Sequence, residues 1–144
     1  MSDLSLISVA HIFMIREGQI LLLRRCNTGH EDGRYGLPAG RLERGEKVHS
    51  AAAREAAEEC GISIAPEDLQ MISVMHINTS YGERVDFFFA AHEWNGEVRN
   101  CEPDKCDDLR WFPLGQLPVN LIPFIRQALD NYLEGVWFSE FGYE

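Results

Sequence analysis

Three glutamates near the middle of this 144-residue chain have the side-chain type and the spacing to bind a metal ion. Glu55, Glu58 and Glu59 are three and four residues apart, so on a helix they share one face. Like charges at this spacing repel one another and reduce helix stability. A polyvalent cation would remove that repulsion, and carboxylate oxygens are the ligands that Mg²⁺ and Mn²⁺ prefer. The alternative is a solvated acidic face on a surface helix, which the spacing by itself does not exclude.

The element that would carry these acids is a helix predicted from Lys47 to about Cys60. The segment is rich in alanine, a strong helix former, and Gly61 follows it in the position of a left-handed C-cap. The side of the helix opposite the glutamates is apolar and can pack on a core; it carries Ala53, Ala56, Ala57 and Cys60. A loop that contains Leu37-Pro38-Ala39-Gly40 brings the backbone to the entrance of this helix.

The wider pattern around this helix resembles the Nudix box. Its matching positions are Gly40, five residues, Glu46, seven residues, Arg54-Glu55, two residues, Glu58-Glu59, one residue, Gly61 and Ile62. A signature of about nine positions over about 23 residues is much more specific than a lone glycine-rich loop. Two positions depart from the usual box: Ala56 replaces a bulky aliphatic residue, and Ala39 replaces a second glycine. Neither position supplies a side-chain ligand, so the chemistry implied by the box is retained.

The resemblance implies a metal site. The carboxylates of Glu55, Glu58 and Glu59 and the backbone carbonyl of Gly40 would bind the ion, with Mg²⁺ expected and Mn²⁺ possible. The metal would neutralise charge on the phosphates of the substrate and activate a water molecule.

The resemblance also implies catalytic roles beyond metal binding. Glu46 would brace the loop through Arg54, and Arg54 would orient carboxylates, since a guanidinium holds two oxygens in fixed geometry. Many members of the family draw a further acid from a loop before an aromatic-containing strand. Glu102, in Glu102-Pro103-Asp104-Lys105 ahead of Arg110-Trp111-Phe112, is the best candidate here. The expected catalytic residues are Arg54, Glu55, Glu58 and Glu102, with either Glu55 or Glu102 as the general base.

The activity implied by the resemblance is hydrolysis of a phosphoanhydride bond in a nucleoside diphosphate linked to a further group X. The segment Glu-Pro-Asp-Lys-Cys followed by Arg-Trp-Phe-Pro is similar to MutT-related pyrophosphatases, which convert nucleoside triphosphates to monophosphates and pyrophosphate. ADP-ribose, nucleotide sugars and dinucleoside polyphosphates stay open, because the box recognises only the pyrophosphate and the metal. Two alternatives without turnover are a nucleotide-binding module of this fold and a structural acidic domain; the intact acids favour an enzyme.

The remaining elements predict an α/β protein. Two hairpins, a further strand and a second helix give the order ββ-α-βββ-α, which indicates a mixed β-sheet between helices. The same α/β/α sandwich is the fold that the resemblance implies. The predicted strands are Leu4 to Ile15, Ile20 to Arg25, Gln70 to Thr79, Arg84 to His92 and Leu109 to Phe112.

The C-terminal part of the chain is predicted to be a helix followed by an aromatic tail. Asn120 is a good N-cap for this helix and Gly135 ends it. The tail is expected to be buried against its own domain or a second subunit; it contains Trp137, Phe138, Phe141 and Tyr143. His11, within the first strand, is interpreted as a core or edge histidine with a satisfied partner, although it could line a base pocket.

Composition bounds the possible partners. A length of 144 residues predicts a single domain over residues 1–144, and a net charge of −10 argues against binding a nucleic-acid polymer. A small phosphorylated nucleotide is still compatible, because bound cations locally invert the sign of the charge. Four cysteines without zinc spacing indicate reduced thiols in a cytoplasmic protein, and the N-terminal segment predicts neither a signal peptide nor a membrane span. The chain is expected to be a monomer or a homodimer.

Overall fold

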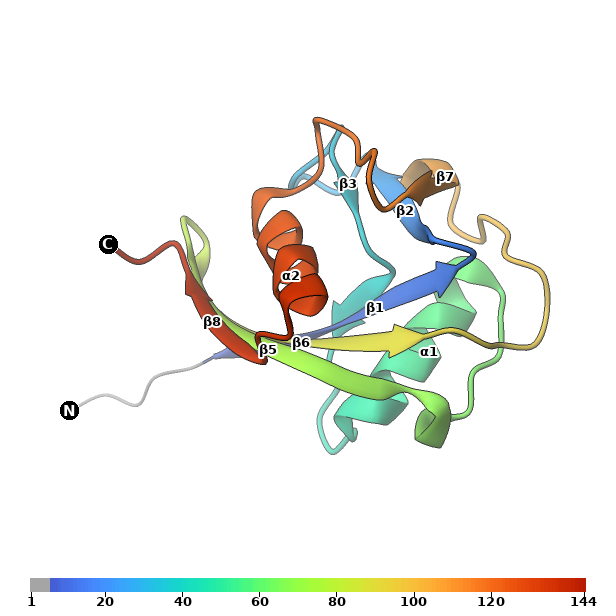
Figure 1. Ribbon diagram of the computed structural model, residues 1–144, viewed down its shortest axis with the longest axis horizontal. Coiled ribbons are helices and arrows are strands. Elements are labelled where there is room, and N and C mark those ends of the chain that lie inside the picture. The colour runs from blue at the N-terminus through green and yellow to red at the C-terminus, as the bar shows by residue number, and fades with distance from the viewer. Residues whose placement is uncertain (1–5) are drawn as a thin grey trace.

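The central feature of the computed structural model, which describes residues 6–144, is a mixed β-sheet with one helix on each face (Figure 1). The predicted α/β/α sandwich is therefore confirmed. The strands are β1 (Ile7–Arg16), β2 (Gln19–Arg25), β3 (Tyr35–Gly36), β4 (Ala39–Arg41), β5 (Gln70–Thr79), β6 (Gly82–Ala91), β7 (Cys106–Pro113) and β8 (Phe138–Phe141). The helices are α1 (Val48–Cys60), the short 3-10 helix η1 (Pro66–Asp68) and α2 (Pro123–Glu134).

Strand β1 connects the two halves of the sheet. The order is β3-β2-β1-β6-β5-β8, with β4 paired to β1 and β7 paired to β2. Strands β1 and β6 run parallel from Ile7↔Arg84 to Met14↔Ala91, whereas β1 meets β2 only at Ile15↔Ile20 and Arg16↔Gln19. A parallel pair requires a crossover, and the segment that contains α1 and β5 makes the connection from β1 to β6.

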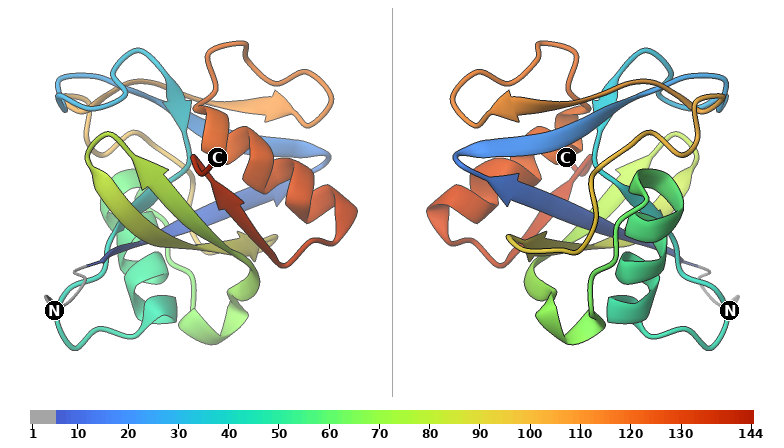
Figure 2. Two further views of the ribbon diagram at one scale, coloured as in Figure 1. Left: turned by 90° about the vertical axis from the view of Figure 1, so that its left-hand side faces the viewer. Right: turned by 90° about the vertical axis from the view of Figure 1, so that its right-hand side faces the viewer.

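The side chains of β1 alternate between two cores. Ala10, Ile12 and Met14 belong to the core under α1, while Phe13 and Ile15 belong to the core under α2. Figure 2 shows the two helices on opposite faces of the sheet. The odd-numbered residues of β1 therefore face α2, and the even-numbered residues face α1.

Helix α1 agrees closely with its prediction. It ends at Cys60, and Gly61 has the left-handed conformation, with φ 70°, and its N–H bonds to Ala57 O at 3.0 Å. Its buried side chains are small: Ala51, Ala52, Ala56 and Cys60. Ala57, which the sequence placed on the packed side, is exposed. A helix with such small buried residues can approach the sheet closely, which sets the position of its glutamates.

Helix α2 begins later than predicted. Its N-cap is Ile122 rather than Asn120, and Pro123 occupies the first turn, where its fixed φ suits a helix start. Asn120 instead joins the segment before β3, because its side-chain Nδ2 donates to Gly33 O at 2.9 Å and its own O accepts Tyr35 N–H at 3.0 Å. Gly135 ends the helix as predicted, with φ 74°.

The aromatic tail forms a strand at the edge of the sheet. Strand β8 pairs in parallel with β5, and its side chains alternate between exposed and half-buried. Phe141 packs against the core under α2, but Trp137 is 72% exposed, so the expectation that the whole tail is buried against its own domain is wrong; burial against a second subunit stays a prediction. Strands β3, β4 and β8 were not predicted, and Leu4 lies outside the described residues. Within residues 6–144 no helix is long and apolar enough to cross a membrane.

Candidate active site

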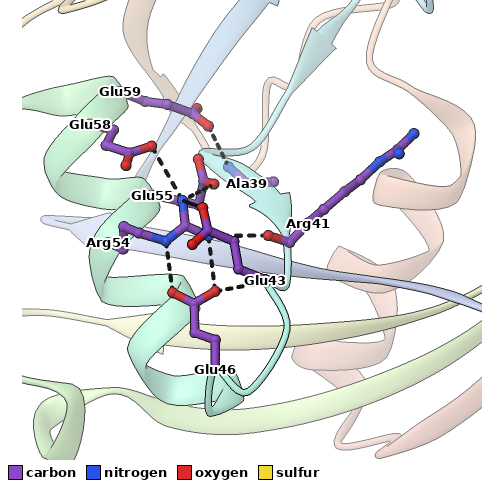
Figure 3. Close-up of polar contacts among 8 residues, drawn as sticks. All are labelled: Ala39, Arg41, Glu43, Glu46, Arg54, Glu55, Glu58 and Glu59. Carbon is purple, nitrogen blue, oxygen red and sulfur yellow. Dashed lines mark hydrogen bonds and ion pairs between the residues drawn. The ribbon is translucent and has the colours of Figure 1, made fainter.

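The guanidinium of Arg54 lies between helix α1 and the segment 41–46 and holds the two together (Figure 3). Its Nε donates to Glu46 Oε2 at 2.7 Å, and its Nη2 donates to Glu46 Oε1 at 3.0 Å and to Arg41 O at 3.1 Å. This bidentate ion pair lowers the pKa of Glu46 and raises the pKa of Arg54. The backbone N–H of Glu43, which donates to Glu46 Oε1, lowers the pKa of Glu46 further. The segment 41–46 is thereby held beside the helix.

The same guanidinium also contacts two of the predicted ligands. Arg54 Nη1 donates to Glu55 Oε1 at 2.8 Å and to Glu58 Oε2 at 3.3 Å. The Glu55 side chain is only 12% exposed, whereas that of Glu58 is 54% exposed. The two acids therefore share a cation but differ in solvation, and Glu58 has more freedom to turn.

Glu59 lies on the other side of Glu55 and points to the backbone of β4 (Figure 3). Its Oε1 accepts the Ala39 N–H at 3.3 Å. Burial raises the pKa of Glu59 well above its ordinary value, and the neighbouring Glu55 carboxyl raises it further. Burial raises the pKa of Glu55 too. The buried, adjoining carboxyls of Glu55 and Glu59 thus retain a proton more readily than solvated glutamates do.

Gly40 is required at its position by the close approach of Glu55. A Cβ at residue 40 would lie 2.0 Å from Glu55 Oε1 and 2.1 Å from Glu55 Cδ. The carboxyl therefore lies directly against the glycine backbone, and any side chain there would displace it. The structure thus brings Gly40, the predicted carbonyl ligand, into contact with Glu55, one of the predicted carboxylate ligands.

The oxygen donors of this site fit a hard divalent cation. Glu55 adjoins both Gly40 and Glu59, and a cation would relieve the cost of ionising the two carboxyls. Over residues 6–144, however, no three His, Cys, Asp or Glu side chains already converge as ligands of one ion. Glu58 is paired with Arg54 and would have to turn away from it to become the third carboxylate ligand.

Glu102 is not joined to this cluster. It lies in the long connection between β6 and β7, and its side chain is exposed. That connection is fastened to the end of α1 by Cys101 N–H to Glu59 O at 3.1 Å and Arg99 N–H to Cys60 O at 3.0 Å. The charge of Glu102 is close enough to contribute to the raised pKa of Glu59. Among the described residues, its carboxylate makes no hydrogen bond.

A cavity of about 460 Å³ begins beside these residues and extends along the α2 side of the sheet. Ala39, Gly40 and Arg41 form one end of it, and β1, β6, the loop after β2 and the start of α2 form its walls. In Figure 3 the Arg41 side chain extends away from the glutamates. This volume is within the range of small-molecule sites. The loop residue His30 also lines it and meets the Tyr81 ring edge-on, with centroids 4.5 Å apart.

A buried polar trio also borders the cavity, and sequence spacing did not identify it. Asp86 is 0% exposed, accepts from Arg84 Nε and Nη2 at 3.0 Å each, and lies 2.7 Å from His11 Nε2. His11 is 5% exposed and lines the cavity, as does Arg84. The prediction of a satisfied core histidine is confirmed for one ring nitrogen. Only the pairing of β1 with β6 brings these distant residues together.

Comparison with known proteins identifies the family. The profile of the NUDIX domain matches residues 5–132. A crystal structure of a MutT NUDIX hydrolase from Burkholderia pseudomallei superposes with a TM-score of 0.81 at 33% identity, covering 88% of this chain and 97% of that one. The chain belongs to the Nudix hydrolase family, whose members generally use divalent metal ions.

Curated relatives are longer than this chain. The human 8-oxo-dGDP phosphatase NUDT18 is 31% identical over 115 residues, which are 78% of this chain and 34% of that protein. The NAD-capped RNA hydrolase NudC of Stutzerimonas stutzeri (strain A1501) is 31% identical over 127 residues, 88% of this chain and 43% of that protein. The chain thus spans less than half the length of these relatives.

Proposed function

We propose that this protein is a metal-dependent hydrolase that cleaves a phosphoanhydride bond of a nucleoside triphosphate, normal or modified, to give a monophosphate and pyrophosphate. The observation that carries the proposal is the adjoining pair Glu55 and Glu59: Glu55 lies against Gly40, and Glu59 accepts the Ala39 N–H, at one end of a cavity of about 460 Å³. Such a pair of carboxyls is costly without a cation and suits a substrate whose phosphates arrive with one.

The metal would be held by Glu55, Glu58, Glu59 and the Gly40 carbonyl; when bound, it supplies charge neutralisation at the phosphates and a more acidic water. Arg54 orients Glu55 and Glu58 and fixes the loop through Glu46. Glu55 is the better general base in this proposal, because it lies within the cluster, whereas Glu102 lies outside it. Glu102 is the second acid to test, since its charge acts on Glu59 from outside the cluster.

The choice of substrate is supported by the relatives. NUDT18 is named for 8-oxo-dGDP, and a putative 8-oxo-dGTP diphosphatase of Bacillus subtilis (strain 168) is 26% identical over 127 residues. The alternative is a nucleotide linked to another group, such as ADP-ribose, a nucleotide sugar or a dinucleoside polyphosphate. It is supported by the ADP compounds hydrolase NudE of Escherichia coli (strain K12), 27% identical over 107 residues.

Product analysis over a nucleotide panel tests the proposal. The purified protein, with Mg²⁺ and then Mn²⁺, is incubated with canonical and oxidised dNTPs, ADP-ribose, NADH, nucleotide sugars and dinucleoside polyphosphates. A monophosphate and pyrophosphate from a dNTP are expected, and Glu58→Gln should abolish most turnover while leaving the melting temperature unchanged. A monophosphate with a sugar phosphate or a second nucleotide would change the substrate class. If nucleotides bind but nothing is released with either metal, a binding module replaces the enzyme.

A further inference from the structure

The turn between β5 and β6 forms one wall of the cavity, although it packs little against the rest of the domain. The residues of this segment that line the cavity are Thr79, Tyr81, Gly82, Glu83 and Arg84. Tyr81 is 73% exposed, and its ring meets His30 edge-on across the cavity. Within the turn, Thr79 Oγ1 accepts the Tyr81 N–H at 3.0 Å and donates to Gly82 O at 2.9 Å. An exposed turn with so few buried contacts opens easily unless other groups hold it.

The end of the chain supplies such a hold. Past β8, Tyr143 lies beside the hairpin of β5 and β6, where its O–H donates to Glu83 Oε1 at 2.6 Å (Figure 1). The Tyr143 oxygen also lies 2.8 Å from His76 Nε2, and the two rings pack with their centroids 4.9 Å apart. A hydrogen bond to a carboxylate is stronger than one between neutral groups. Tyr143 thus fastens Glu83 of β6 to His76 of β5 at the base of the turn.

Gly142 allows the chain to reach this position. It has a φ of 84°, and a Cβ there would lie 2.1 Å from Asn78 O. The Asn78 side-chain Nδ2 donates to Gly142 O at 3.4 Å, so the tail lies directly on the end of β5. Another residue at 142 would be strained in this conformation and would collide with the Asn78 backbone. The glycine therefore places Tyr143 against the hairpin.

Tyr143 acts from outside the cavity. Among the described residues it is not part of the cavity lining, whereas its partner Glu83 is. A change at Tyr143 therefore reaches a bound ligand through Glu83 and the turn. The same turn carries Tyr81, whose contact with His30 joins this wall to the loop after β2.

We propose that Tyr143 is a positioning residue: its hydrogen bond to Glu83 fixes residues 79–84 as a wall of the cavity and thereby strengthens binding of the nucleotide. This inference rests on the proposed function, because it takes a nucleotide as the occupant. It adds a residue of the C-terminal tail, which lies outside both the motif around α1 and the cavity.

Steady-state kinetics with dGTP and Mg²⁺ test the effect on binding. Tyr143→Phe removes one oxygen and keeps the ring, and we expect KM to rise about three- to tenfold, as for the loss of one hydrogen bond. The kcat should stay within about twofold, because the glutamates that would hold the metal are untouched. Tyr132→Phe is the matched control, since it removes the same atom from a ring that packs on Phe13 under α2, and it should change neither parameter.

A double-mutant cycle tests whether Tyr143 acts through Glu83. Glu83→Ala removes the acceptor of the hydrogen bond, so adding Tyr143→Phe to it should change KM by less than about twofold. A KM that rises by the full factor again in the double variant would show that Tyr143 acts by another route and would overturn the proposal.

Hydrogen–deuterium exchange of the nucleotide-free protein tests the turn itself. The amides of residues 80–83 should exchange about threefold or more faster in Tyr143→Phe than in the wild type, while those of β1 stay unchanged. Gly142→Ala should have the same effect, because it displaces the tail. Unchanged exchange in a folded Tyr143→Phe variant, or faster exchange with an unchanged KM, would contradict the positioning role.

The outcomes separate this inference from the proposed function. Hydrolysis of dGTP with an unchanged KM in Tyr143→Phe would leave the proposed function intact and remove only this inference. If dGTP binds without hydrolysis, the proposed function fails, and the Kd of dGTP from calorimetric titration decides this inference through the same expected rise. If dGTP neither binds nor is hydrolysed, both are overturned for this nucleotide.

Discussion

Glu55 and Glu59 differ from Glu58 in solvation, and that difference determines how each would respond to substitution. The first two adjoin one another and have raised pKa values because of burial, while Glu58 is half-exposed. Burying carboxylates costs free energy, and Arg54 balances the charge of Glu55 only in part, so the pair destabilises the metal-free protein at neutral pH. The same pair is the part of the site that gains most from a cation.

Replacing Glu59 should therefore stabilise the protein and inactivate it at once. Glu59→Gln removes a buried ionisable group, and we expect the metal-free variant to gain about 1 kcal/mol in the free energy of unfolding at pH 8. Turnover should fall on the order of 100-fold, because the variant loses a carboxylate charge that would hold the metal at the substrate phosphates. Urea denaturation and steady-state kinetics measure the two effects. Glu134→Gln, an exposed acid at the end of α2, is the control and should change neither.

The contact between Gly40 and Glu55 makes a second prediction. Gly40→Ala places a methyl group 2.0 Å from the present position of Glu55 Oε1, so the carboxyl must move. A displacement of about 1 Å can cost on the order of 100-fold in rate, and we expect a loss of that size. The far-ultraviolet circular dichroism should be unchanged, because residue 40 does not need a positive φ. Gly115→Ala, which has open space around it, should retain wild-type activity.

At the scale of elements, helix α1 and segment 41–46 form one unit through Arg54. The guanidinium joins Glu46, Glu55 and the Arg41 backbone at once, which a single ammonium group cannot do. The position of the glutamates relative to β4 thus depends on the shape of one side chain as well as on its charge.

Arg54→Lys should lower activity although the charge is kept. We expect kcat/KM to fall about 10- to 100-fold, as it does when the partners of a metal site are disturbed. The effect should appear as weaker activation by Mg²⁺, measured by titrating the metal in the assay. Arg44→Lys is the control, because Arg44 is an exposed arginine of the same loop. Equal kinetics for Arg54→Lys and the wild type would show that charge alone is sufficient.

Strand β8 divides the aromatic tail into a packed and an exposed part. Phe141 packs against the core under α2, and Trp137 is 72% exposed. We expect Phe141→Ala to reduce the free energy of unfolding by about 2 kcal/mol, below the range for a fully buried ring. Trp137→Ala should stay within about 0.5 kcal/mol of the wild type, as for most surface changes. Urea denaturation of both variants gives the comparison, and a reversed order would contradict this account of the tail.

At the scale of the whole molecule, metal binding should be linked to pH and to folding. Glu55 and Glu59 have folded-state pKa values above the unfolded value of about 4.3, so the folded, metal-free protein binds more protons. Their contribution is favourable below pH of about 4.3 and is lost as the pH rises through the folded-state values. Glu46 has the opposite sign: its lowered pKa stabilises the fold above pH of about 4.3, and this is lost on further acidification.

A divalent cation should offset the loss of folding stability that Glu55 and Glu59 cause as the pH rises. At a concentration a hundredfold above its Kd, a metal that binds only the folded state adds about 3 kcal/mol to the free energy of unfolding. We expect the rise in melting temperature on adding Mg²⁺ to be larger at pH 8 than at pH 5, because the carboxyls are ionised at pH 8. Scanning calorimetry with Mg²⁺ or EDTA measures it. A rise that is equal at both pH values would contradict the carboxylate site.

Much of α1 and its surroundings was predictable, because the responsible features are local in the chain. The alanine-rich segment, the cap at Gly61 and the shared face of Glu55, Glu58 and Glu59 follow from helical periodicity. The start of α2 was predicted less well, since Asn120 bonds to Gly33 rather than capping the helix, and Pro123 determines where the helix begins. A side chain with a suitable type can be used by a distant segment, which sequence spacing does not show.

The sequence alone determined the chemistry available to this protein: a helix with three acids, an arginine and a preceding glycine, within an α/β fold. The tertiary structure decided which of those groups are desolvated, that Gly40 lies against Glu55, and that Glu102 remains outside the cluster. It also joined His11 to Asp86 and Arg84 through the parallel pairing of β1 with β6. The physical reason is that helical spacing depends on neighbours in the chain, whereas burial, and with it pKa and the number of unused hydrogen bonds, depends on neighbours in space.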